Sequence, residues 1–492
     1  MILACTGLAA GVAGAQSSDT GGGPLGRQSF FDATGVITTL DVHGPVNDHG
    51  AFFQSLGTNG RSCATCHVAS QAMSISAAGV QQRFAETRGR DPLFAPVDGA
   101  NCPNARQESA ADHSLLLQHG LVRIFLKPPA GAGFSITVVH DPYGCAITAD
   151  PADGLPIVSV YRRPLPTTNL GFLSTIMFDG RETLKPLNVK SSFPMNLAAD
   201  LTQQAIDAIA IHAQGTAAPS AAQLNDIVEF ELGLYTAQSF DNAAERLHAD
   251  GAYGGPRYLA TDLSVAYYPG MNDSLGADPT GLAFNPGAMQ LYAAWAGAGQ
   301  ERYPDTLRRE QARRDIAAGE VLFDSAPVHI SNVRGLNDNA ALGNPSTFTG
   351  TCTTCHDTPN AGNHSFPLPL DIGTGHTLLP GAEPDANIAA GLAELSMPDL
   401  PIYFVTCPDP FNAGQPASFY TTDPGKALVS GLCSDFNRGK GPILRGLAAR
   451  APYFHNGAAA NLNELVNFYN QRFQMNLTEQ QKRQLVAFLN SL

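Results

Sequence analysis

The chain contains two copies of a C-x-x-C-H motif, CATCH at residues 63–67 and CTTCH at 352–356. Two thiols at this spacing meet the two vinyl groups of a haem, and the imidazole after the second thiol reaches the iron from the same side. Each motif therefore predicts one covalently bound c-type haem. The predicted thioether residues are Cys63, Cys66, Cys352 and Cys355, and the predicted proximal iron ligands are His67 and His356.

Two other uses of paired cysteines fit this chain less well. A zinc ribbon brings together two C-x-x-C pairs about 15 to 20 residues apart, whereas more than half of the chain separates these motifs. A thioredoxin-like dithiol has one C-x-x-C at the start of a helix in a βαβ unit, which neither neighbourhood suggests. Two haems are therefore the preferred interpretation.

The composition excludes several classes of partner. The 492 residues carry a formal net charge of -14 with only 15% charged residues, which argues against binding to nucleic acid or anionic lipid. After the N-terminus, no stretch approaches the ~18 uninterrupted apolar residues that a membrane span requires. The first apolar run ends in Ala13-Gly14-Ala15, which resembles a signal-peptide cleavage site. We expect an export signal at 1–15 and a periplasmic or secreted protein.

Four cysteines lie outside the two motifs and the leader, namely Cys102, Cys145, Cys407 and Cys433. An even number of cysteines in an exported protein favours disulfides over buried thiols. Four cysteines allow three connectivities. Pairing of nearest neighbours, Cys102 with Cys145 and Cys407 with Cys433, is the preferred one.

The first half of the chain is predicted to mix loops, strands and helices. Residues 16–45 are Gly-rich and polar and are expected to form a linker or arm. A short helix should carry Phe52 and Phe53 into a core just before the first motif. The segment 68–170 contains the short β-like runs LVRIFLKP and FSITVVH. Apolar spacing predicts two helices within 201–238.

The second half is predicted to be more helical. A helix is expected over RRDIAAGEVLFDS, before the second motif. Asn461 should cap a second helix, and Thr478 and Gln481 should form the capping box of a last one. The single tryptophan, Trp295, lies in a loop-rich segment and is expected in the core or at an interface.

Four sequence motifs occur in this order along the chain: CATCH, TIMFDGRETLKPL, CTTCH and GPILRGLAARAPYFHNGAAANLNELVNFYNQRF. Together they resemble the di-haem bacterial cytochrome c peroxidases and their relatives, the methylamine dehydrogenase maturase and the rubber oxygenases. The resemblance implies a mainly α fold of two c-type cytochrome domains with loop-rich and short β insertions. The first domain would cover 46–240, with an insertion at 68–170. A loop-rich segment, 241–310, would connect it to the second domain at 311–492.

For the second haem, the resemblance implies Tyr469 as the sixth iron ligand, where the peroxidases have a methionine and the maturase a tyrosine. Met475 and Met397 are competing ligands. From the residues alone, Tyr469 belongs to the apolar stripe of the helix after Asn461 and would be a core residue. His455, in PYFHNG, would lie near the haem edge.

Two family features between the haems are altered in this chain. The family's calcium uses main-chain carbonyls, here of Arg450 and Pro452, and an asparagine whose place Arg163 takes. A cation there would repel calcium, so its presence stays open. The family's tryptophan before Asp-Gly-Arg is replaced by Phe178. Phenylalanine is harder to oxidise, which favours direct tunnelling between the haems.

The free face of the first haem decides the type of chemistry. The next histidine after His67 is His113, and Met73 is expected to pack against the porphyrin, so the first iron should be open to peroxide or dioxygen. Peroxide cleavage needs an acid–base group over this iron. The resemblance places Asn196 where the peroxidases have a glutamate, and Phe193 resembles the apolar distal residue of the rubber oxygenases.

These features favour an exported di-haem oxidoreductase that reduces hydrogen peroxide at the His67 haem. Electrons would arrive through the His356 haem from a small donor protein, a cytochrome c or a cupredoxin. The expected catalytic residues are His67, Phe193 and Asn196. One alternative is a di-haem oxygenase acting on an apolar or protein substrate, and another is an electron carrier with two six-coordinate haems.

Overall fold

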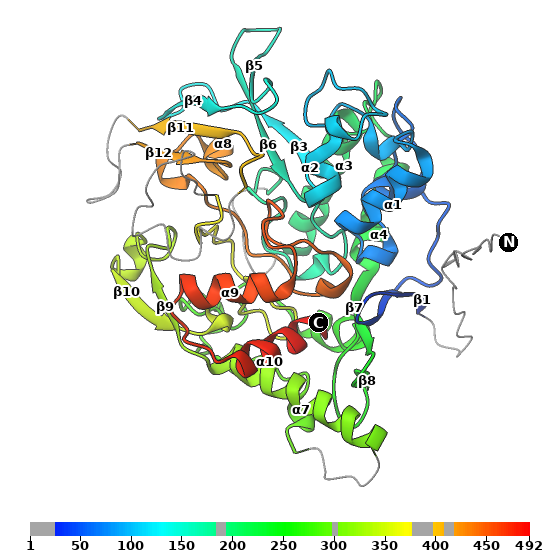
Figure 1. Cartoon of the computed structure of the whole chain (residues 1–492), viewed down its shortest axis with the longest axis vertical. Helices are drawn as coiled ribbons and strands as arrows, with labels where there is room; N and C mark the ends of the chain where they lie inside the picture. Colours follow the sequence, from blue (N-terminus) through cyan, green and yellow to red (C-terminus); the bar gives the residue numbers. More distant parts are fainter. Residues whose placement is uncertain (1–24, 184–192, 298–303, 376–396, 408–417) are drawn as a thin grey trace, which may run out of the picture.

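The computed structural model describes residues 25–183, 193–297, 304–375, 397–407 and 418–492 (Figure 1). The structure is 33% helix and 17% strand, and the described strands form four sheets. The expectation of a mainly α fold is therefore wrong. It rested on the haem motifs and the signature stretch, which constrain the surroundings of the haems but not the sheets formed by the long segments between them.

A four-stranded antiparallel sheet joins the start of the chain to the end of its first half. Its order is β1-β2-β7-β8, with the bounds Gly26–Phe31, Gly35–Asp41, Leu234–Asp241 and Glu245–Arg246. Two of these strands, β1 and β2, lie in the segment 16–45, for which a linker or arm was expected. Their threonines are buried because they pair across the sheet: the hydroxyls of Thr38 and Ser239 lie 2.7 Å apart, and those of Thr39 and Thr236 2.8 Å apart.

Two helix pairs lie in the same half as the first motif. They are α1 (Ala77–Thr87) with α2 (Ser114–His119), and α3 (Phe193–Ile211) with α4 (Ala221–Gly233). The last two confirm the helices predicted within 201–238, although the chain enters β7 at Leu234. The short helix predicted before the first motif is a 3-10 turn, Ala51–Phe53, and Phe52 is buried in the core beside α3 and α4.

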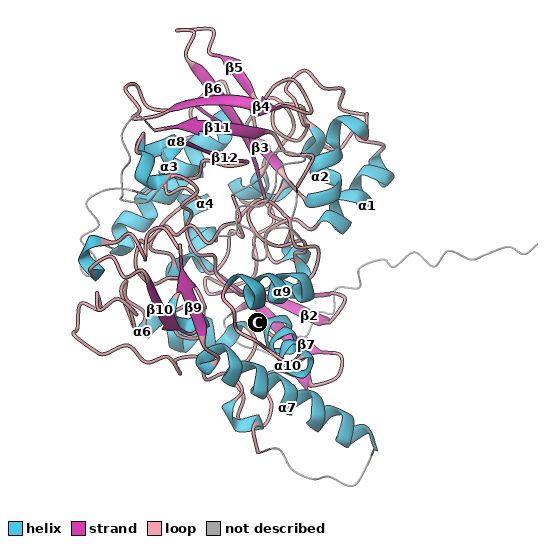
Figure 2. Ribbon diagram, turned by 60° about the vertical axis from the view of Figure 1, so that its left-hand side comes forward, coloured by secondary structure: helices cyan, strands magenta, loops and turns pink. Residues whose placement is uncertain are grey.

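The segment 68–170 contributes strands to two further sheets. One consists of β3 (Val122–Leu126), β6 (Pro156–Arg162) and β5 (Ile147–Ala149). In the other, β4 (Ser135–His140) pairs with β11 (Ile402–Thr406), which pairs with β12 (Ser418–Thr421) (Figure 2). The two predicted β runs are confirmed as β3 and β4. Because β4 pairs with β11, the segment is joined to the second half of the chain.

Both predicted disulfides are present. Cys102 is bonded to Cys145, and Cys407 is bonded to Cys433. The first braces the loops that lead into and out of β3 and β4. The second ties the end of β11 to the turn that follows α8 (Ala427–Ser430). Cross-links of this kind stabilise segments that bury little apolar surface of their own.

Three helices build the core of the C-terminal part, with α10 packed on both others. They are α7 (Pro304–Ser325), α9 (Leu462–Arg472) and α10 (Glu479–Asn490). The shorter elements are α5 (Pro256–Tyr258), α6 (Ser264–Ala266), β9 (Val328–Ser331) and β10 (Thr347–Gly350). The cap by Asn461 and the capping box of Thr478 and Gln481 are confirmed, and Trp295 is buried in the core beside α10. Within the described ranges, no helix is long and apolar enough to cross a membrane.

Candidate functional site

The two C-x-x-C-H motifs fold into equivalent turns. Each begins with a 3-10 turn, Cys63–Thr65 and Cys352–Thr354, and in each the histidine amide donates to the carbonyl of the first cysteine at 3.0 Å. A hydroxyl residue before each turn, Ser62 or Thr351, forms a capping box with the threonine inside it. The same local bonds thus hold both motifs in one conformation.

Each motif histidine is oriented by a hydrogen bond from Nδ1. The Nδ1 of His67 donates to the Met73 carbonyl at 3.0 Å, and the Nδ1 of His356 donates to the Gly362 carbonyl at 2.8 Å. This bond fixes the tautomer and leaves Nε2 free to bind iron. Burial lowers the pKa of both imidazoles to about 4, so both are neutral and able to act as ligands at pH 7.

Two large cavities contain the motifs, and each is lined by the two thiols and the imidazole of its own motif. The first cavity has a volume of about 200 Å³ and the second about 220 Å³. The four motif cysteines carry free thiols. The residues present therefore fit one covalently attached haem in each cavity.

The two cavities share a wall. Six residues line both of them: Arg163, Pro164, Leu165, Phe178, Lys440 and His455. Within this wall, the rings of Phe178 and His455 are stacked, with centroids 4.6 Å apart and planes inclined by 12°. His455 thus faces both cavities, rather than only the second haem edge, as the sequence predicted. Phe178 is the residue that the sequence resemblance aligns with the family's tryptophan.

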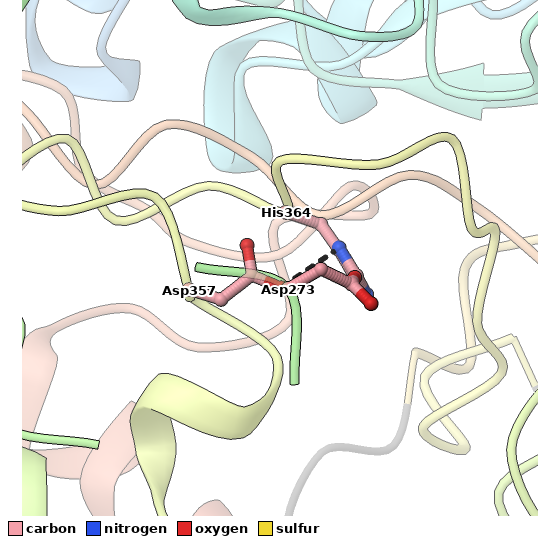
Figure 3. Close-up of side chains that lie close together, drawn as sticks. All are labelled: Asp273, Asp357 and His364. Atoms are coloured by element: carbon pink, nitrogen blue, oxygen red, sulfur yellow. Dashed lines mark ion pairs between the residues drawn. The ribbon is translucent and has the colours of Figure 1, made fainter. Parts of the chain in front are cut away.

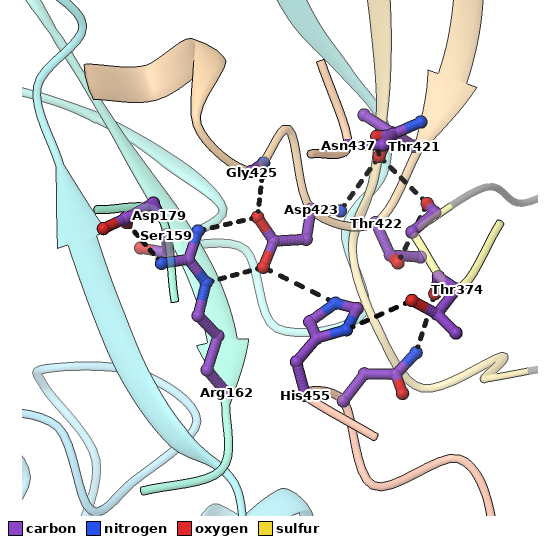
Figure 4. A network of polar contacts seen from close by, with 12 residues as sticks. Ser159, Arg162, Asp179, Thr374, Thr421, Thr422, Asp423, Gly425, Asn437 and His455 are labelled. Atoms are coloured by element: carbon purple, nitrogen blue, oxygen red, sulfur yellow. Dashed lines mark hydrogen bonds and ion pairs between the residues drawn. The ribbon is translucent and has the colours of Figure 1, made fainter. Parts of the chain in front are cut away.

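A buried ionic network supports this wall (Figure 4). Arg162 donates to both carboxylate oxygens of Asp423, at 2.6 and 2.9 Å, and to Asp179 at 2.5 Å. Burial by itself raises the pKa of both carboxyls, but the charge of Arg162 outweighs burial and holds both pKa values below the ordinary range. The Nε2 of His455 lies 3.7 Å from Asp423, and its Nδ1 lies 3.5 Å from the hydroxyl of Thr374. The network therefore borders the stacked imidazole.

The residues expected to bind calcium hold a guanidinium instead. Arg163 donates to the carbonyls of Arg450 at 2.7 Å, Ile75 at 2.5 Å and His119 at 3.0 Å. The Arg450 carbonyl is one of the two that the resemblance assigns to calcium, and the other belongs to Pro452. Because a fixed positive charge already occupies this position, the residues present do not fit a calcium ion.

Two of the three candidate sixth ligands reach the second cavity. Tyr469 and Met475 line it, whereas Met397 is buried elsewhere, in a cluster with Leu115 and Tyr161. Burial raises the pKa of Tyr469, and the neighbouring thiols of the second motif raise it further. Without a metal its phenol is therefore neutral, and binding to iron would require loss of this proton.

The two predicted distal residues, Phe193 and Asn196, lie at the start of α3. Phe193 begins α3, and its side chain lies outside the described residues. Asn196 does not belong to the lining of the first cavity, to which α3 contributes residues farther along, from Leu201 to Ile209. His113 is buried, with both ring nitrogens within 2.9 Å of main-chain carbonyls, so it is no iron ligand.

Two ionisable residues that the sequence analysis did not single out line the first cavity, Glu231 and Lys440. One oxygen of Glu231 accepts a bond from Thr167 at 2.7 Å, the other has no partner, and burial raises its pKa to about 7. Lys440 donates to the Thr175 carbonyl at 3.0 Å, and burial lowers its pKa to about 7. Both can therefore gain or lose a proton near neutral pH.

The sequence did contain a signal for one of them. On α4, Leu224, Ile227, Val228 and Glu231 follow the i, i+3, i+4, i+7 spacing of a buried helix face. A glutamate on such a face is a buried charge that needs an explanation. Lys440 lies in an irregular segment where no periodicity could reveal its burial.

Comparison with known proteins gives one partial relative. The cytochrome-c peroxidase IdrP2 of Denitromonas iodatirespirans is 38% identical over 78 residues, which cover 14% of this chain and 21% of the relative. The chain therefore matches only about a fifth of that protein's length. No family model matches the chain.

Proposed function

We propose that this protein is an exported di-haem c-type oxidoreductase of the peroxidase type, which reduces hydrogen peroxide at the His67 side with electrons delivered through the His356 side. The observation that carries the proposal is the pair of equivalent motif turns in two cavities with one common wall. The partial similarity to a cytochrome-c peroxidase supports the same class of oxidoreductase.

The chain's own residues have separable tasks in this reaction. When bound, the haems supply iron for electron transfer and for cleavage of the O–O bond. His67 and His356 bind iron through Nε2, and their Nδ1 bonds keep the rings in place. Conversion of one peroxide to two waters takes two electrons and two protons. Glu231 and Lys440 line the first cavity and can hold such protons near neutral pH.

The expected donor is a small soluble redox protein, a cytochrome c or a cupredoxin. The chain has a formal net charge of -14, so a basic donor would be attracted over the Debye length of about 10 Å at 0.1 M salt. Donor turnover at limiting donor concentration should therefore fall as ionic strength rises.

A di-haem oxygenase acting on an apolar substrate is the second candidate. It is favoured by the first cavity, whose lining includes many Leu, Ile, Ala and Pro side chains and does not include Asn196. An apolar lining suits an apolar substrate better than it suits peroxide alone.

One experiment separates these functions. EPR and optical spectra of the ferric protein are recorded before and after addition of peroxide, with and without a reduced donor. A high-spin signal and rapid donor oxidation are expected for the peroxidase. A stable oxygen complex with slow donor turnover would favour the oxygenase. Two low-spin haems inert to peroxide would refute both and leave an electron carrier.

A further inference from the structure

A group of side chains that could bind a metal lies next to the second motif, and one of them, His364, lines the second cavity. Asp273, Asp357 and His364 have relative exposures of 1%, 0% and 5%, and one potential ligand atom from each lies within 4.8 Å of the others. Figure 3 shows the three side chains pointing toward one another. They come from two segments, the loop around 270–278 and the loop that follows His356.

Each carboxylate is held by main-chain amides through one oxygen, while the other oxygen faces the cluster. Asp273 Oδ2 accepts bonds from the amides of Leu275 at 3.0 Å and Ala277 at 2.8 Å, and its Oδ1 has no hydrogen-bond partner. Asp357 Oδ1 accepts from the Ser365 amide at 2.6 Å, and its Oδ2 has no hydrogen-bond partner. This is the arrangement of metal-binding carboxylates oriented by a second set of bonds.

The histidine completes the set. Its Nδ1 lies 3.2 Å from Asp357 Oδ2, and its Nε2 is buried without a hydrogen-bond partner. No lysine or arginine of the described residues forms an ion pair with Asp273 or Asp357. Two buried carboxylates without a cation nearby are costly to keep ionised, and a metal ion compensates this cost. A divalent cation would neutralise both at once.

We propose that Asp273, Asp357 and His364 bind one divalent transition-metal ion, for which zinc is the best fit. An imidazole and two carboxylates are usual zinc ligands, at about 2.0 to 2.2 Å. Calcium and magnesium take six or more oxygen ligands and are poorly served by an imidazole. The site is separate from the haem ligands and does not depend on the proposed peroxidase function.

The position of the site indicates a structural role. Ser274 donates to the Thr354 carbonyl at 2.6 Å, and Asn272 donates to the Asp357 carbonyl at 3.1 Å, so the loop around 270–278 already clamps the second motif. Asp357 directly follows the proximal ligand His356. An ion at this position would fasten the clamp and fix the main chain that carries the proximal histidine.

The test is elemental analysis of the purified holoprotein together with its haem content. About one zinc per chain is expected beside two irons, because the three ligands are buried and metal binding is coupled to folding. Asp273→Asn and His364→Asn should lose most of this zinc with unchanged haem content, whereas Asp262→Asn, at an exposed carboxylate of the same region, should keep it. Stoichiometric manganese lost in the same two variants would support the site with a different ion.

Two results would overturn the proposal. The first is wild-type protein without a stoichiometric non-iron metal that also fails to take up Zn²⁺ in equilibrium dialysis. The second is zinc that stays bound in both variants, since it would then occupy another site. If Asp273→Asn does not fold, His364→Asn and chelator-treated wild type reconstituted with Zn²⁺ give the same decision.

Discussion

The imidazole of His455 lies nearly parallel to the phenyl ring of Phe178, 4.6 Å away, in the wall between the two cavities. Phenylalanine is a poor redox relay, so electrons between haems in these cavities would have to tunnel through this wall. The spacing of the haems would then depend on how firmly the wall is packed. The residues that hold it are therefore the first to test.

Arg162 is the cation of the buried network behind this wall. Its replacement in Arg162→Met leaves Asp423 without its bidentate partner and deprives Asp179 of one of two arginines. Removing one partner of a buried ion pair costs about 3 to 5 kcal/mol, and we expect the free energy of unfolding at pH 7 to fall by about that amount. Urea denaturation followed by Soret absorbance would measure it.

Lys127→Met provides the control for this variant, because Lys127 pairs with Asp150 and Asp153 at the surface. Exposed ion pairs contribute little to stability, because solvent screens them. The lowered pKa values of Asp179 and Asp423 also make the stability of the wild type depend on pH. The two carboxylates contribute fully to the free energy of unfolding above the ordinary carboxyl pKa of about 4, and this contribution is lost as pH falls through their lower folded pKa values. Equal, small losses in both variants would show that the network does not stabilise the fold.

Tyr469→Phe tests the sixth ligand of the second haem. Because Tyr469 lines the second cavity, loss of its phenol should change the optical and EPR spectra of one haem and leave those of the other unchanged. Tyr453→Phe is the matched control, since Tyr453 lines the same cavity but its hydroxyl is bonded to the Leu447 carbonyl at 2.9 Å. An unchanged spectrum in Tyr469→Phe would exclude this ligand and direct attention to Met475.

Whether the protein binds calcium at the Arg163 position can be tested by measuring its calcium content. Because Arg163 fills the place expected for the ion, purified wild-type protein should contain no stoichiometric calcium. Arg163→Ala frees the carbonyls of Arg450, Ile75 and His119 in the protein interior. An unsatisfied buried polar group costs about 1 to 3 kcal/mol, so the unfolding free energy should fall by at least about 2 kcal/mol. One bound calcium per wild-type chain would refute this assignment.

Much of the local structure was predictable because it depends on nearby residues. The cap at Asn461, the capping box of Thr478 and Gln481 and both disulfides follow from short-range spacing. The pairing of β4 with β11 was not predictable, since it joins residues far apart in the chain, and pairing between distant strands leaves no local pattern.

The candidate site also has parts that the sequence predicts and parts that it does not. Local chemistry identifies the motif cysteines and their histidines, whereas the shared wall depends on how distant segments pack. Arg162, Phe178 and His455 come from three separate stretches, so only the fold brings them together. Asn196 was chosen by its register in a resemblance, and a shift along α3 is enough to take it away from the cavity.

Glu231→Gln should alter the dependence of stability on pH. Burial raises the pKa of Glu231 from 4.5 to about 7. Between these two pH values the folded chain keeps this proton and the unfolded chain has released it, so the free energy of unfolding of the wild type falls as pH rises. Glutamine carries no such penalty and can still accept the bond from Thr167. Relative to wild type, the variant should therefore gain up to about 3 kcal/mol between pH 4 and pH 8. Glu229→Gln is the control, because Glu229 is exposed on the same helix and its replacement should give no such gain. Urea unfolding at both pH values would measure the free energies. If the two variants behave alike, Glu231 is already ionised in the folded wild type and the prediction is wrong.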